Sequence, residues 1–179
     1  MNRELLAEQM SELPLFAYFY IDPKEIEYSD RIRWICENEC PRFGKSWACP
    51  PAVGTVAQCA AKCRGFDHCL VIGSVAEWAD ITDMEATLAT RPEHEALTDQ
   101  VAAMLEAQGV KPFVLSTDSC AICKECTCQS GAPCRHPEKM HPCVESHGIN
   151  LIPVLEAEGL PFIYGDTTVT WYSLLFFNE

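Results

Sequence analysis

The segment Lys111–Cys126 reads KPFVLSTDSCAICKEC. Its first part, residues 111–117, is rich in apolar and β-branched residues and predicts a strand. Its second part places Cys120, Cys123 and Cys126 at successive three-residue steps. A strand therefore leads directly into a cysteine-rich loop, and we expect a sheet to position that loop.

The rest of the chain predicts further strands and helices around this segment. The expected strands are 15–21, 68–73, 111–117 and 168–177. The expected helices are 3–13, 55–64, 92–108, 142–147 and a short one that ends at Gly159. Residues 36–51, with three prolines and Gly44, predict a loop. This order indicates one α+β domain, 1–179, with a sheet of about four or five strands, helices packed on one face and cysteine-rich metal loops at strand ends.

The composition limits the classes of function. The net charge is -13, which argues against nucleic acid and against anionic membranes as partners. The same charge favours a redox partner protein with a basic docking face, while the oligomeric state is left open. The charged N-terminus carries no signal peptide pattern, and no apolar run is long enough to span a bilayer. We therefore expect a cytoplasmic protein.

The cysteines are the main chemical signal. The chain has twelve, crowded into short runs with gaps of two or three residues. Cysteines so close in sequence rarely form good disulfides with each other, but they converge readily on one metal site. Metal ligation in a reducing compartment is the better explanation.

The triple Cys120, Cys123 and Cys126 matches the spacing of the first three ligands of a bacterial ferredoxin cluster. Zinc sites also use two-residue gaps, but typically in two separated pairs. The spacing therefore favours a [4Fe–4S] cluster, with zinc as the alternative.

A second group of cysteines lies in residues 36–51, where Cys40 and Cys49 are each followed by proline. Cys134 follows Cys126 by eight residues, so it could complete the same cluster or reach across to the other loop. The candidate ligands are seven cysteines: Cys36, Cys40, Cys49, Cys120, Cys123, Cys126 and Cys134. Two four-iron clusters use eight thiols, so either one iron is open to a small ligand or another residue serves. The further candidates are Cys128, Cys143 and His136.

The remaining cysteines fit the core better. Cys59 and Cys63 share one face of a predicted helix, and Cys69 lies inside an apolar strand. Cysteine behaves there as a small hydrophobic residue.

Two sequence elements together resemble a known family. The first reads Cys36, Cys40-Pro41, Gly44, Trp47 and Cys49-Pro50-Pro51, and the second reads Cys120, Cys123, Cys126 and Pro133-Cys134-Arg135-His136-Pro137. They resemble an uncharacterised family described as predicted metal-binding proteins, common in anaerobic bacteria and archaea. The resemblance runs from about Cys36 to the terminal strand and implies metal binding without a known reaction. That family usually has serine where this chain has Cys143, so no general role for Cys143 is implied.

The sequence thus leads to a small electron-transfer or redox-partner protein with one or two [4Fe–4S] clusters. A zinc-stabilised interaction module and an enzyme with an open iron site are the alternatives. We further expect the two cysteine loops to depend on each other, with Cys49 serving the Cys120 triple and Cys134 joining Cys36 and Cys40. The alternative is two independent sites, each within its own loop.

Overall fold

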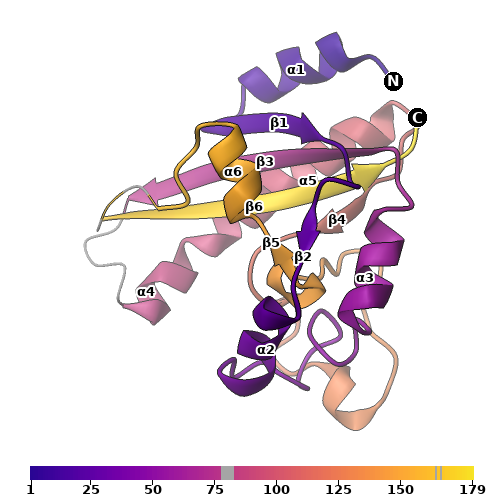
Figure 1. Cartoon of the computed structure of the whole chain (residues 1–179), viewed down its shortest axis with the longest axis vertical. Helices are drawn as coiled ribbons and strands as arrows, with labels where there is room; N and C mark the ends of the chain where they lie inside the picture. Colours follow the sequence, from indigo (N-terminus) through magenta and orange to yellow (C-terminus); the bar gives the residue numbers. More distant parts are fainter. Residues whose placement is uncertain (78–82, 164, 166) are drawn as a thin grey trace.

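The computed structural model describes residues 1–77, 83–163, 165 and 167–179. It has an α+β fold in which a sheet crosses the upper part of the molecule and irregular segments fill the lower part (Figure 1). This architecture confirms the predicted fold class.

The main sheet has four antiparallel strands in the order β1-β3-β6-β4. They are β1 (Ala17–Ile21), β3 (His68–Glu77), β6 (Thr168–Phe177) and β4 (Phe113–Leu115). The two long strands β3 and β6 pair along their whole length, from His68↔Phe177 to Glu77↔Thr168. A second, two-stranded sheet joins β2 (Glu27–Tyr28) to β5 (Ile149–Asn150).

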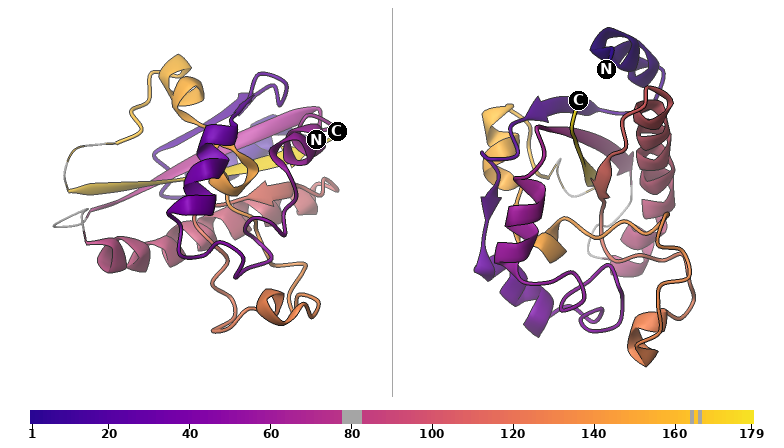
Figure 2. Two further views of the ribbon diagram at one scale, coloured as in Figure 1. Left: turned by 60° about the horizontal axis from the view of Figure 1, so that its bottom comes forward. Right: turned by 90° about the vertical axis from the view of Figure 1, so that its right-hand side faces the viewer.

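Alternating side chains of β3 give the sheet two apolar faces. Cys69 and Val71 belong to one buried cluster, and Leu70 and Ile72 belong to the other. Helices α1 (Arg3–Ser11) and α5 (Arg91–Ala107) cover the Leu70 face. Helices α3 (Val56–Cys63) and α6 (Ile152–Ala157) cover the Cys69 face. The helices therefore lie on both faces rather than on one, as the right-hand view of Figure 2 shows.

Several helix ends follow the local sequence. Thr55 caps α3 in a full capping box with Gln58, which satisfies two backbone N–H groups at the helix start. Gly109 and Gly159 lie just beyond α5 and α6 in the left-handed region, with φ of 79° and 68°. The predicted boundaries of these helices are confirmed within a few residues.

The largest local difference concerns Cys36, which was expected in a loop. It lies in α2 (Asp30–Asn38), whose start is capped by Ser29. The buried side of α2 presents Arg33 and Cys36, whereas Trp34 and Ile35 are exposed. An apolar periodicity analysis misses such a helix, because its buried face carries a charged residue and a thiol.

Other short elements were also missed: α4 (Met84–Ala89), the 3-10 turn η1 (Thr127–Ser130), β2 and β5. The predicted helix over 142–147 is a single 3-10 turn, η2 (Glu145–His147), closed by Gly148. Elements this short carry too few residues for a periodic pattern.

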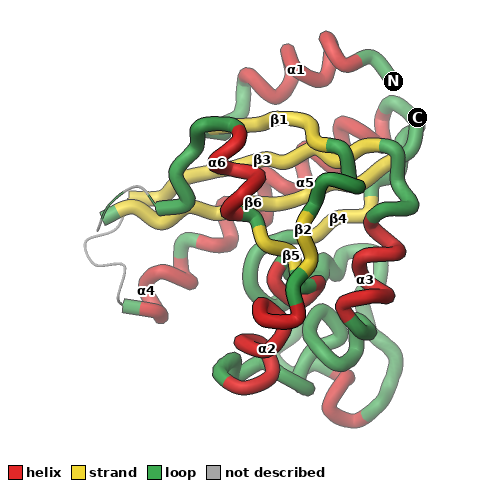
Figure 3. Tube along the Cα trace, viewed as in Figure 1, coloured by secondary structure: helices red, strands yellow, loops and turns green. Residues whose placement is uncertain are grey.

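The strand β4 ends before its predicted limit because the chain changes partner. Ser116 forms an isolated parallel bridge with Cys143 instead of continuing along β6. Its N–H donates to the Pro142 carbonyl at 2.9 Å, and its carbonyl accepts from the Val144 N–H at 3.0 Å. This bridge turns the chain toward the lower part of the molecule, where Figure 3 shows the loops gathered.

Cys69 offers a test of the core assignment. Its side chain is fully buried between the sheet and α3. Cys69→Ser buries a hydroxyl where a thiol packed, which we expect to cost about 1–3 kcal/mol in the free energy of unfolding. Urea unfolding measures this loss, and the metal content should stay unchanged. Loss of metal from folded Cys69→Ser protein would contradict a purely structural role.

Candidate metal centre

Four cysteines of the second loop line one cavity. They are Cys120, Cys123, Cys126 and Cys134, and the apolar walls are Trp47, Ile122 and Met140. All four cysteines are partly exposed. The four thiols therefore line one space, whereas the spacing of the triple groups only the first three.

The cavity is narrow in this conformation, at about 20 Å³. Among the described residues, no three His, Cys, Asp or Glu side chains converge closely enough to hold a single metal ion. A four-iron cluster has a different requirement, because each thiolate binds a separate iron. The only regular element in residues 120–134 is the short turn η1, so the loop can widen without breaking the sheet.

Contacts from outside the loop hold its shape. The indole Nε1 of Trp47 donates to the Ala132 carbonyl at 3.1 Å and lies 3.3 Å from the Thr127 hydroxyl. Within the loop, Arg135 Nη1 donates to the Glu125 carbonyl at 2.9 Å. The Trp47 contact joins the first cysteine loop to the second.

Cys36, Cys40 and Cys49 form a second group. Cys36 lies in α2, and Cys40 follows the end of that helix. The pKa of Cys36 is raised to about 11, mainly by burial and also by the neighbouring thiols Cys40 and Cys49. Burial also raises the pKa of Cys49, although the hydroxyls of Ser119 and Ser46 beside it act in the opposite direction.

Cys143 lies next to this second group. Its N–H donates to the Ala48 carbonyl at 3.4 Å, which places it beside Cys49 in the neighbouring segment. Its Sγ accepts the N–H of Ser146 at 3.1 Å. Burial raises the pKa of the Cys143 thiol well above its ordinary value, and Glu145 and Cys49 raise it further.

The raised pKa values have a direct consequence for metal binding. Metals bind thiolates, so a metal must displace a proton from each thiol it takes. Thiols whose pKa is raised stay protonated at neutral pH when no metal is bound. Metal affinity at such a site therefore increases with pH.

The exchange of Cys49 and Cys134 across the loops stays a prediction, because Cys49 lies beside Ser119, next to the Cys120 triple, as well as near its own group. Cys134 lines the same cavity as the Cys120 triple, and Cys49 lies near Cys36 and Cys40. Cys128 lies near Cys126 but does not line the cavity. His136 lines the cavity edge.

Arg33 is a residue of this region that the sequence analysis missed. Its side chain is only 6% exposed. One guanidinium nitrogen donates to the Gly54 carbonyl at 2.8 Å, and the other donates to the Ser146 carbonyl and approaches Cys59 Sγ at 3.7 Å. Cys59 is thus a contact of Arg33 as well as a core residue. The only sequence signal for a buried Arg33 was its position among the apolar residues Ile32, Trp34 and Ile35.

Comparisons with known proteins agree with a metal site and go no further. A family model described as "Predicted metal-binding protein (DUF2284)" matches residues 20–177. No curated protein and no solved structure matches the chain. Within the part of the chain that the structure describes, no helix is long and apolar enough to cross a membrane.

Proposed function

Because the chain belongs to this family of predicted metal-binding proteins, we propose that it is an iron–sulfur protein that transfers electrons. Its [4Fe–4S] cluster is held by Cys120, Cys123, Cys126 and Cys134. The cluster supplies one-electron redox chemistry, and the chain supplies the thiolate ligands, the apolar walls and the docking surface.

One observation carries this proposal: the ferredoxin-like triple shares its cavity with a fourth cysteine, Cys134. Four thiolates are the number that a [4Fe–4S] cluster needs. The apolar walls from Trp47, Ile122 and Met140 make the surroundings of the sulfurs less polar, and the polarity around a cluster tunes its potential. Zinc sites built from two separated pairs would not need three thiols at successive three-residue steps.

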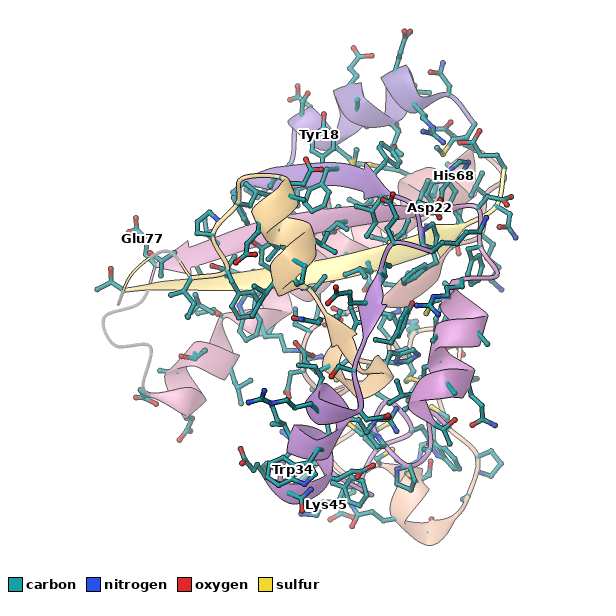
Figure 4. All side chains as sticks on the ribbon, viewed as in Figure 1. Tyr18, Asp22, Trp34, Lys45, His68 and Glu77 are labelled. Carbon is teal, nitrogen blue, oxygen red and sulfur yellow. The ribbon has the colours of Figure 1, made fainter. Side chains whose placement is uncertain are left out.

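The surface around the cysteine loops suits a redox partner. Trp34, Ile35, Phe43 and Ile122 are exposed on or next to these loops, and Figure 4 labels Trp34 at this end of the molecule. Exposed aromatic and aliphatic side chains are typical of the central part of a protein interface. With a net charge of -13 over the whole chain, the partner we propose carries a basic docking face, which steers the encounter.

The test is metal analysis of protein purified without oxygen. We expect brown protein that contains iron and a matching amount of acid-labile sulfide. The variant Cys123→Ser should lose this iron, because it removes one thiolate of the cavity. The control Cys128→Ser should keep it, because Cys128 does not line the cavity.

A colourless protein with stoichiometric zinc, after growth with ample iron, would contradict the proposal. It would favour the zinc-stabilised interaction module instead.

A further inference from the structure

A buried positive charge lies beside the second group of cysteines without a carboxylate partner. Arg33 is 6% exposed, and no carboxylate of the described residues lies within ion-pair distance of its guanidinium. Its Nε has no hydrogen-bond partner among those residues. An uncompensated buried charge costs several kcal/mol, so such a group usually has an anion nearby.

A thiol lies within contact distance of the guanidinium. Arg33 Nη2 approaches Cys59 Sγ at 3.7 Å, and Cys36 follows Arg33 by about one helical turn on the buried side of α2. The carbonyls of Gly54 and Ser146 fix the guanidinium in place. Arg33 and Cys36 therefore both reach the segment that follows Cys143, because Arg33 donates to the Ser146 carbonyl and Cys36 Sγ lies 3.8 Å from the Glu145 carbonyl.

The number of cysteines near Arg33 also suits a four-iron cluster, which takes four thiolates. The second group contains Cys36, Cys40 and Cys49, and Cys143 lies within electrostatic range of Cys49. Cys143 Sγ already accepts a backbone N–H, from Ser146 at 3.1 Å. Sulfurs that bind iron in clusters commonly accept such N–H groups, which raises the reduction potential.

We propose that Cys36, Cys40, Cys49 and Cys143 hold a second four-iron cluster, and that Arg33 is its buried counter-charge. This inference rests on the proposed iron–sulfur function. The four thiols bind as thiolates and release their protons to solvent. The carboxylates of Asp118 and Glu145 lie within electrostatic range of Cys49 and Cys143, respectively. Four thiolates added beside these carboxylates would repel them, and the buried positive charge of Arg33 offsets part of that repulsion.

The alternative is a structural arginine that only joins α2 to the segments at Gly54 and Ser146. A structural role predicts lower stability when Arg33 is replaced, but no change in a redox property. The counter-charge role predicts a lower reduction potential of one cluster, because removing a nearby positive charge makes reduction less favourable.

The first experiment counts iron per chain in protein purified without oxygen. We expect iron for two clusters in the parent protein and about half of it in Cys143→Ser and in Cys40→Ser. Cys63→Ser is the matched control, because Cys63 is equally buried but packs in the core. Cys40 is partly exposed, so its variant reports on the ligand set even if the Cys143 variant does not fold.

The second experiment follows both clusters by electron paramagnetic resonance during a redox titration. Arg33→Met should lower the midpoint potential of one signal and leave the other unchanged, whereas Arg33→Lys should lower it less. Full iron in both the Cys143→Ser and Cys40→Ser variants would overturn the ligand set. An unchanged potential in Arg33→Met would overturn the counter-charge. Parent protein with iron for one cluster only would overturn the second site and leave the proposed function standing.

Discussion

The free energy of unfolding is expected to fall by several kcal/mol as the pH drops from 6.5 to 4, because two buried histidines are neutral in the folded protein. Burial lowers the pKa of His94 to about 4, and it lowers the pKa of His147 to about 4. In the unfolded chain both regain the ordinary value of 6.5. Each histidine then contributes about 3 kcal/mol over this range.

The sign of the effect follows from proton binding. Between pH 6.5 and pH 4 the two histidines are protonated in the unfolded chain but stay neutral in the folded protein. Stability therefore rises with pH in this window and is lost on acidification. Above pH 6.5 both states are neutral at these positions, and the effect disappears.

The surroundings of His94 explain why it stays neutral. The ring is 1% exposed, with Nδ1 at 2.8 Å from the Ser74 hydroxyl and Nε2 at 2.8 Å from the Ser173 hydroxyl. Ser173 also contacts Ser116, whose hydroxyl donates to Glu95 at 2.5 Å. Hydroxyls can donate to or accept from a neutral ring, but the nearby Arg91 opposes a positive one.

Urea unfolding at several pH values tests this expectation. His94→Gln and His147→Gln should each reduce the pH dependence by about one proton, and the double variant should remove most of it. Comparing variants cancels the contribution of the thiols, which all of them share. A pH dependence equal to that of the parent in both single variants would show that neither histidine is responsible.

The fold was predictable where the chain has long regular patterns. The strand over 168–177 and the helix over 92–108 were found nearly to the residue, because each has enough residues to show its period. The two-stranded sheet β2–β5 was not, because two-residue strands have no period at all. The division of helices between both faces depends on crossover paths that local sequence does not encode.

The candidate site was predictable in its donors but not in their grouping. Cysteine spacing singled out the Cys120 triple, and spacing is a local property. The position of Cys143 depends on the Ser116–Cys143 bridge and on Ala48, and the loop that carries Cys134 is held by the Trp47 contact with Ala132. These are contacts between distant segments. Arg33 was missed because an isolated arginine is usually a surface residue.

Among residues that are not proposed ligands, Trp47 is the one whose replacement should lower iron affinity most. Its indole lies in the first cysteine loop but lines the cavity of the second, and its Nε1 donates to the Ala132 carbonyl at 3.1 Å. Residues that orient metal ligands typically contribute 10–100-fold to metal affinity. We therefore expect Trp47→Ala to lower iron affinity about 10–100-fold, measured by competition with a chelator.

Two further variants separate the roles of the ring and of its N–H group. Trp47→Phe keeps an aromatic wall but cannot donate to Ala132, so its affinity should fall between those of the parent and Trp47→Ala. Trp34→Ala is the matched control, because Trp34 is 52% exposed and belongs to the same half of the chain; it should bind iron as tightly as the parent. If Trp47→Ala matches the parent, the first loop does not support the second. If it loses affinity, the two loops depend on each other through an indole, and no cluster needs to share ligands from both.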